Sequence, residues 1–423
     1  MVRGQGFFFV RNSPGVNYTE SIDWLYGTQT FGIKLGLENP RTLLSALAID
    51  PDDPGPAILH VAGTNGKGSV CAMTERILRD VGIKTGLFTS PHLVTYRERI
   101  RVNGTMISEE MVAEGLSELR GRTYLCENHP TFFELSLALA MGHFVRERCE
   151  VVILETGMGG RLDATNAIWS DLSVITSIGL DHQQWLGETI REIAAEKAGI
   201  LKEGVPVIIG DLHPEAREVV GRRALALGIP CVEAHPLPDD WETGLKGSHQ
   251  RENAALAVEA ACRLEGERLT EEGIRHSVAT VQWPGRFQQI DDSLYLDGAH
   301  NPSAAEVLRR TWQEQCGDEK AHLVFGAVGS KDIAGVFQAL LPILASVSFI
   351  PVQSERRLTV EEMRAFLREA GGGAVPQEEF ESLPDAVASA QARGGKTLVA
   401  GSLFLVGEAL GHFLGERFEV SLQ

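Results

Sequence analysis

The residues best suited to chemistry lie in one glycine-rich segment, residues 60–69, which reads HVAGTNGKGS. Gly63, Gly66 and Gly68 would let backbone amides approach phosphate oxygens, because no Cβ stands in the way. Lys67 could reach the β and γ phosphates of a nucleotide, and Ser69 could bind Mg²⁺. The segment is therefore predicted to hold a nucleoside triphosphate.

The spacing departs from the common G-x-x-x-x-G-K-[ST] pattern in two ways. Val61 occupies the position of the first glycine, and Gly68 separates Lys67 from Ser69. Ordinary phosphate-loop kinases and GTPases therefore fit poorly. A glycine-rich turn that only closes a strand–helix unit is the alternative, but the lysine, the hydroxyl and the flanking elements together favour phosphate binding.

The elements that must position this loop are an apolar strand at 57–62 and a helix that runs from Ser69 to about Gly82. Further strand candidates alternate with helical patterns at 85–88, 151–154, 172–178 and 205–209. A second series occupies 294–296, 322–325, 346–350 and 397–400. This alternation predicts an α/β fold with a mostly parallel sheet and helices on both faces.

The two series predict two domains, and Pro284 and Gly285 mark a short hinge between them. We expect residues 1–283 to form the domain that carries the phosphate loop. Residues 284–423 are expected to form a smaller, Rossmann-like α/β domain.

Polar residues follow several of these strands, at the sheet edge where ligands collect in parallel α/β folds. Glu155 could coordinate Mg²⁺, although it could instead cap a helix or pair with Arg161. Ser90 is a second candidate for the metal or a phosphate, and a simple Ser-Pro turn is the alternative. His182 could offer a ring nitrogen to a metal, with Asp181 fixing its tautomer, but the local pattern favours a histidine satisfied by a loop carbonyl.

Two further segments carry polar groups. Lys197 lies late in a helix for which Gly199 is the expected C-cap, and a lysine there commonly offsets the helix dipole. In the second series, Asp297 could hold a ribose hydroxyl or cap the helix near Ser303, while His300 and Asn301 would face the crevice between the domains.

The composition limits the classes of partner. The 423 residues carry a formal charge of −18, which argues against a nucleic-acid or anionic-membrane surface. No apolar run is long enough to span a bilayer or to form a signal-peptide core. The six cysteines are scattered, with no pair at metal-binding spacing, so we expect a cytoplasmic protein with structural thiols.

Nine motifs in order resemble folylpolyglutamate synthase and dihydrofolate synthase, the folate-directed branch of the Mur ligase superfamily. They are residues 35–38, 63–69, 90–93, 131–134, 155–166, 181–182, 196–200, 284–287 and 297–302. The resemblance spans roughly residues 20 to 410. It implies an ATP-dependent ligase that adds L-glutamate to dihydropteroate or to the γ-carboxylate of reduced folates.

The resemblance also implies roles for individual residues. The nucleotide-binding positions are Gly63, Thr64, Asn65, Gly66, Lys67, Gly68, Ser69, Asn253, Arg286 and Asp297. Two Mg²⁺ ions would be held by Ser69, Ser90, Glu155 and His182, beside a carbamylated Lys197. The pterin-bearing substrate would lie near Leu35, Gly36, Leu37, Thr131, Phe132, Leu162, Asp163 and Ala164. His300 and Ser402 are the candidates for the glutamate site, with His300 also the candidate base.

The implied mechanism phosphorylates the acceptor carboxylate, because a carboxylate is a poor acyl donor until its oxygen becomes a leaving group. Lys67 and the metal ions would neutralise the charge on the transferring phosphoryl group. The matches at 35–37 and 131–132 favour an enzyme that accepts dihydropteroate, and we expect a monomer.

Two other interpretations stay open. A peptidoglycan-type Mur ligase would need a sizeable N-terminal domain, and only about sixty residues precede the loop. A nucleotide-binding regulator without catalysis is the other, and the intact Lys67, Glu155, His182 and Lys197 argue against it.

Overall fold

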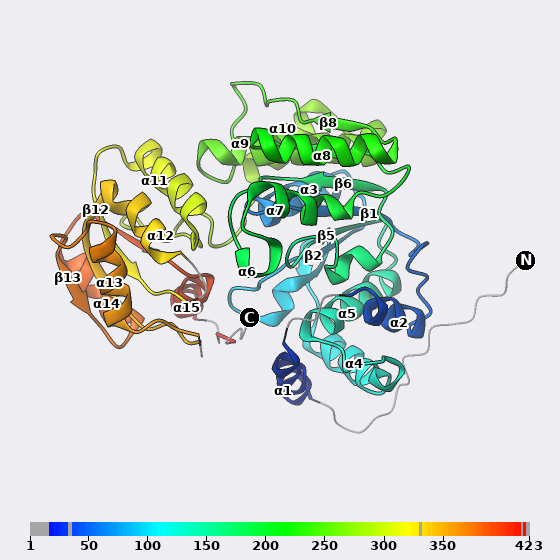
Figure 1. The fold of residues 1–423 in the computed structure, drawn as a ribbon, viewed down its shortest axis with the longest axis horizontal. Helices are drawn as coiled ribbons and strands as arrows, with labels where there is room; N and C mark the ends of the chain where they lie inside the picture. Colours follow the sequence, from blue (N-terminus) through cyan, green and yellow to red (C-terminus); the bar gives the residue numbers. More distant parts are fainter. Residues whose placement is uncertain (1–16, 33–35, 330–331, 355, 416–417, 420–423) are drawn as a thin grey trace, which may run out of the picture.

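A computed structural model describes residues 17–32, 36–329, 332–354, 356–415 and 418–419, and the account below is confined to them. The chain forms two α/β domains (Figure 1). An eight-stranded sheet organises the N-terminal domain, and a six-stranded sheet organises the C-terminal domain. The predicted fold class is confirmed.

The N-terminal sheet has the strand order β4-β3-β2-β5-β1-β6-β7-β8. Its strands are β1 (Ala57–Ala62), β2 (Thr85–Phe88), β3 (Ile100–Val102), β4 (Thr105–Met106), β5 (Val151–Glu155), β6 (Leu172–Ile175), β7 (Val207–Ile209) and β8 (Cys231–Glu233). All neighbouring pairs from β2 to β8 are parallel, while β3 is antiparallel to both β2 and β4. The central strand β1 therefore lies between β5 and β6.

Helices cover both faces of this sheet, because alternate residues of each strand point to opposite sides. Leu59 and Val61 of β1 pack in a core with α3 (Lys67–Asp80), α9 (Ser248–Glu265) and α10 (Glu271–Thr280). Ile58 and Ala62 point the other way. That face is covered by α1 (Tyr18–Gly27), α2 (Glu38–Ala46), α4 (Glu109–Arg120), α5 (Phe132–Arg146), α7 (Ile190–Lys197) and α8 (Pro214–Leu227).

The C-terminal sheet has the order β13-β12-β11-β14-β10-β9, and only β9 runs antiparallel to its neighbour. The strands are β9 (Gln288–Gln289), β10 (Leu294–Leu296), β11 (Ala321–Phe325), β12 (Leu344–Phe349), β13 (Gln377–Glu379) and β14 (Lys396–Ala400). One face packs on α11 (Pro302–Cys316), α12 (Ile333–Leu340) and α13 (Val360–Glu369). The other packs on α14 (Leu383–Ala392) and α15 (Leu403–Leu414).

The remaining helical elements are short. They are α6 (Gln183–Leu186) and seven 3₁₀ turns: Thr28–Phe31, Tyr96–Arg99, Thr123–Leu125, Ala164–Ala167, Ala198–Ile200, Gly266–Arg268 and Leu341–Ile343. None of the helices in the described ranges combines the length and the apolar character needed to cross a lipid bilayer.

Several element boundaries differ from the sequence prediction. Strand β6 ends at Ile175 rather than at 178, because the residues that follow bond to the phosphate loop. Helix α3 begins at Lys67, two residues earlier than predicted. Gly199 is not the C-cap of α7: Ala198 is, and the chain continues as a 3₁₀ turn. A Cβ at Gly199 would lie 2.5 Å from Cα of Arg161, so the glycine serves close packing instead.

The C-terminal segment returns to the N-terminal domain at Glu419. Its carboxylate accepts hydrogen bonds from the Tyr18 hydroxyl at 3.0 Å, the Thr95 hydroxyl at 3.1 Å and the backbone N–H of Tyr96 at 2.7 Å. The backbone N–H of Glu419 donates to the carbonyl of Val94 at 2.8 Å. The two domains are therefore tied at a point far from the hinge in the sequence.

Candidate active site

The carboxyl ends of four neighbouring strands bring the predicted polar residues to one edge of the N-terminal sheet. Because the strand order is β2-β5-β1-β6, Gly63 after β1 lies between Glu155 at the end of β5 and Thr176 after β6. Ser90 follows β2, beside Glu155. The polar residues predicted to lie at this edge are therefore found there. Glu155 is the last residue of β5.

The phosphate loop is packed so closely that a Cβ at Gly63 or Gly66 would clash with a neighbouring side chain. A Cβ at Gly63 would lie 1.9 Å from Oγ1 of Thr176, and one at Gly66 would lie 2.4 Å from Oδ1 of Asn253. Gly66 also has φ of +86°, in the left-handed region that favours glycine. Helix α3 starts at the next residue, so its N-terminal N–H groups face the loop, an arrangement that suits phosphate.

Two lysines converge on the carbonyl of Gly63. Lys67 donates to it at 3.1 Å and Lys197 donates to it at 2.8 Å. Burial and the nearby charge of Lys67 lower the pKa of Lys197 to about 7, and the carboxylates of Asp181 and Asp163 oppose this. A substantial fraction of Lys197 is therefore a neutral amine near neutral pH, unlike an ordinary surface lysine.

Glu155 is a buried carboxylate in a small pocket lined by both polar and apolar residues. Its Oε2 accepts the backbone N–H of Ser90 at 3.1 Å. Burial raises the pKa of Glu155, and the positive charge of Lys67 and the Ser90 N–H oppose that rise. The pocket is lined by Gly68, Thr89, Ser90, Pro91, Leu93, Glu98, Arg101, Glu155, Trp283, Pro284, Arg286 and Leu403, so both domains contribute to it. A cation placed beside Glu155 would be stabilised by this carboxylate.

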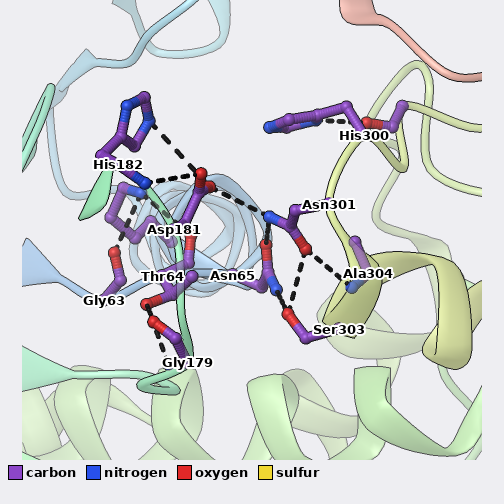
Figure 2. A network of polar contacts seen from close by, with 12 residues as sticks. Gly63, Thr64, Asn65, Gly179, Asp181, His182, His300, Asn301, Ser303 and Ala304 are labelled. Carbon is purple, nitrogen blue, oxygen red and sulfur yellow. Dashed lines mark hydrogen bonds and ion pairs between the residues drawn. The ribbon is translucent and has the colours of Figure 1, made fainter. Parts of the chain in front are cut away.

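His182 lies at the start of α6 with φ of +50° and a side chain that is 42% exposed. Its Nε2 lies 3.9 Å from the Asp181 carboxylate, which is too long for the predicted hydrogen bond that would fix the tautomer. The carboxylate instead accepts the backbone N–H of His182 and the side-chain amide of Asn301 (Figure 2).

Within the described ranges, no three His, Cys, Asp or Glu side chains form a group that could hold a metal. Mg²⁺ commonly takes only one or two carboxylates and fills its other positions with water and phosphate oxygens. The buried Glu155, together with the hydroxyls of Ser69 and Ser90, fits that kind of site. A dedicated cage of protein ligands is not formed.

The predicted nucleotide contacts outside the loop come from both domains. Asn253 of α9 lies against Gly66, and Arg286 lines the pocket. Asp297 accepts the backbone N–H groups of Phe287 and Ala299, each at 2.8 Å. Burial raises the pKa of Asp297, and Arg286 opposes this. The alternative that Asp297 caps α11 is wrong, because Asn301 is the N-cap.

The candidates for the substrate site form two groups. Thr131 caps α5, and the ring of Phe132 stacks on Tyr26 with centroids 5.6 Å apart. Gly36 and Leu37 precede α2 and are partly exposed, whereas Leu35 lies outside the described residues.

The second group follows β5. Leu162 is partly exposed and Ala164 lies in the core, while the carboxylate of Asp163 accepts the N–H groups of Met158 and Thr165. Ser402 is buried as the N-cap of α15. Among the described candidates, Thr131, Phe132, Asp163, Ala164 and Ser402 are buried.

Comparison with known proteins identifies the family. Residues 61–217 match the family described as Mur ligase middle domain, and residues 285–403 match Mur ligase, glutamate ligase domain. The chain is 36% identical to the dihydrofolate synthase/folylpolyglutamate synthase of Bacillus subtilis, over 78% of this chain and 84% of that protein. It is 34% identical to the enzyme of that name from Escherichia coli, over 92% of this chain and 94% of that protein.

The chain belongs to the folylpolyglutamate synthase/dihydrofolate synthase family of the Mur ligase superfamily. It is an ATP-dependent ligase of an acid and an amino acid. Solved members share its fold: an E. coli protein in complex with DHPP and ADP has a TM-score of 0.82 at 31% identity, covering 93% of this chain and 98% of that one. The Mycobacterium tuberculosis folylpolyglutamate synthase complexed with ADP and AMPPCP has a TM-score of 0.86 at 27% identity. The match covers 95% of this chain and 100% of that chain.

Sequence reasoning missed several buried polar residues of this Mur ligase. Arg99 is fully buried, donates to Nδ1 of His92 at 2.8 Å and lies 5.0 Å from the centre of the Phe132 ring. Arg101 lies 5.7 Å from the Trp283 ring at the pocket. Arg97 and Arg99 lie in the 3₁₀ turn Tyr96–Arg99 and only Arg101 lies in β3, so no strand periodicity in the sequence marked these residues.

Proposed function

We propose that this chain joins L-glutamate to dihydropteroate and to the γ-carboxylate of reduced folates. As a folylpolyglutamate/dihydrofolate synthase, it is an ATP-dependent glutamate ligase. This proposal rests on the arrangement at one edge of the sheet. The phosphate loop, Glu155 and Lys197 meet at this edge. Asn301 and Ser303 of the C-terminal domain contact the same loop. One surface thus joins the site of phosphoryl transfer to the domain expected to bring glutamate.

The triphosphate of ATP is assigned to Gly63–Ser69, with Asn253, Arg286 and Asp297 as further contacts. The close packing of Gly63 and Gly66 and the start of α3 at Lys67 support this assignment. Two Mg²⁺ ions are assigned to Ser69, Ser90, Glu155 and His182, where they would neutralise phosphate charge. A relative from Yersinia pestis has been solved with AMPPNP and a Mn ion, at 29% identity and a TM-score of 0.83.

Lys197 is assigned as a carbamylated lysine. Carbamylation requires a neutral amine, which adds to the carbon of CO₂ and loses one proton to give an anionic carbamate. The pKa of about 7 that burial gives Lys197 supplies that neutral amine near physiological pH. The anion would face the loop beside Lys67, which would offset its charge.

The acceptor is assigned to residues of two regions, 35–37 and 131–132 before α2 and α5, and 162–164 after β5. The ring of Phe132 is buried between Tyr26 and Arg99, so it would support the acceptor site from beneath. The relatives named dihydrofolate synthase/folylpolyglutamate synthase support an acceptor of either kind. Ser402 is assigned to the glutamate site.

The chain's own residues explain the chemistry. The acceptor carboxylate attacks the γ-phosphorus of ATP, ADP leaves, and an acyl phosphate forms while Lys67 neutralises charge on the moving phosphoryl group. The amine of glutamate then attacks the acyl carbon and phosphate leaves. His300 Nδ1 donates to the carbonyl of Gly298 at 2.7 Å, so Nε2 is the nitrogen that can accept the proton from the amine.

We also propose that residues 1–283 and 284–423 are the two functional units, that the protein is a cytoplasmic monomer, and that its ligands are small molecules. The charge of −18 supports a protein that does not bind nucleic acid.

One assay tests the proposed function. Purified protein is incubated with ATP, Mg²⁺ and labelled L-glutamate, with dihydropteroate or tetrahydrofolate as acceptor in parallel. We expect label in the product of each acceptor. Label with only one acceptor would refute the dual specificity, and label with neither would refute the folate assignment.

A further inference from the structure

Asn301 stands at the contact between the two domains, and both ends of its amide are used (Figure 2). Its Oδ1 accepts the backbone N–H of Ala304 at 2.8 Å, which caps α11, and the hydroxyl of Ser303 at 3.0 Å. Its Nδ2 donates to Oδ2 of Asp181 at 3.0 Å and to Oδ1 of Asn65 at 3.3 Å. Asn301 is 2% exposed, so water competes little for these bonds.

The two residues that Asn301 reaches belong to different parts of the phosphate site. Asn65 lies within the phosphate loop, and its backbone carbonyl accepts the hydroxyls of Thr176 and Ser177 at 2.7 and 3.0 Å. Its side chain is turned toward the C-terminal domain, where Nδ2 donates to Ser303 at 2.8 Å. Asp181 precedes His182 and accepts that residue's backbone N–H at 2.8 Å. Asn301 therefore joins the loop and the His182 turn to the start of α11.

This junction fixes the position of the segment that carries Asp297 and His300. Within that segment, Asp297 accepts the N–H of Ala299 and Nδ1 of His300 donates to the carbonyl of Gly298. Because Asn301 is the N-cap of α11, this helix follows directly after the segment that carries Asp297 and His300. A change in the Asn301–Asp181 contact would therefore shift the whole segment relative to the phosphate loop.

We propose that Asn301 is a positioning residue that couples ATP cleavage to amide formation by holding the C-terminal domain against the phosphate loop. The inference rests on the proposed function. Without this contact, water would attack the acyl carbon of the acyl phosphate, the bond between carbon and the phosphate oxygen would break, and the products would be the original carboxylate and phosphate. ATP would then be consumed without an amide being made.

The test compares ADP formed with glutamyl amide formed. Asn301→Asp keeps an oxygen that caps α11 but replaces the donor with a carboxylate facing Asp181. We expect kcat for ligation to fall at least about tenfold and the ADP-to-amide ratio to rise at least about fivefold. Asn301→Ser also keeps a cap without the donor, and it should raise the ratio in the same direction.

Two further variants separate positioning from simple stability. Asp332 caps α12 in the same domain, so Asp332→Asn makes the reverse exchange between amide and carboxylate at a helix cap away from the site and should leave the ratio near one. Combining Asp181→Asn with Asn301→Asp exchanges donor and acceptor across the contact and should bring the ratio back toward one.

The outcomes are distinct. If the wild type makes the amide and the Asn301 variants still form one ADP per amide, the coupling role is refuted and the proposed function stands. A double variant as uncoupled as Asn301→Asp overturns the assigned contact. A wild-type protein that forms no amide overturns the proposed function and the coupling role with it.

Discussion

Replacing Lys197 by methionine is expected to remove a pH dependence of stability that burial imposes on this lysine. The lysine Nζ donates to the Gly63 carbonyl, and the pKa is lowered from its ordinary value of 10.5 to about 7. Between these two values the unfolded chain binds one proton more than the folded chain. The free energy of unfolding of the wild type must therefore rise with pH through this window, and the penalty is fully present below pH 7.

The size of this effect follows from the slope of the unfolding free energy against pH. One proton contributes about 1.4 kcal/mol per pH unit, so Lys197 adds roughly 2–3 kcal/mol of stability between about pH 7 and pH 9. Lys197→Met lacks this increment, because methionine does not titrate. The free energy of unfolding of Lys197→Met minus that of the wild type should therefore be larger at pH 7 than at pH 9.

The assay is urea unfolding across this pH range in buffer freed of CO₂, so that only the amine is present. Lys246→Met, which changes an exposed lysine, is the matched control and should follow the wild type. Parallel pH profiles for the wild type and Lys197→Met would refute the argument for a neutral amine. Adding bicarbonate should then raise ligase activity in the wild type alone, and active protein with an unmodified Lys197 by mass spectrometry would refute the carbamate.

Three other changes test separate parts of the site. Gly66→Ala places a Cβ 2.4 Å from Asn253 at a φ of +86°, so calorimetry should show at least about tenfold weaker ATP binding and a stability loss of about 1–2 kcal/mol. Glu155→Gln removes the buried carboxylate, and Mg²⁺ titrations of activity should shift by about 10–100-fold, with no shift arguing against a metal ligand. Thr165→Val removes a hydroxyl that donates to Asp163 at 2.5 Å. The acceptor KM should rise while the ATP KM stays constant, and unfolding should show a cost of about 1–3 kcal/mol.

The sequence was sufficient for the parts of the fold that depend on local pattern. Strands β1, β2 and β10 have the predicted bounds, because short apolar runs bounded by glycine or polar residues leave little choice. The phosphate loop was equally clear, since its glycines, lysine and hydroxyl must occur together to hold phosphate.

Residues whose surroundings come from distant segments were harder to predict. Lys197 has the pattern of an ordinary lysine at a helix end, and only its burial against Gly63 changes its charge. The side chains of Asn301 and Glu419 make their main contacts across the domains, with partners more than one hundred residues away. The Asp181 carboxylate, which could have oriented the His182 ring, accepts hydrogen bonds from the Asn301 amide and the His182 backbone N–H. No local pattern carries that information.

The strand order β2-β5-β1-β6 also bears on how such an enzyme can diversify. Strand β1, which leads into the phosphate loop, and β5, which ends in Glu155, are adjacent in space, yet 88 residues separate Ala62 from Val151. That intervening stretch contributes β2, β3 and β4, the edge of the sheet, and helices α4 and α5. Thr131 and Phe132, assigned to the acceptor, lie in this stretch at the start of α5 and outside the phosphate loop, so substitutions there can alter acceptor preference while the loop sequence is kept.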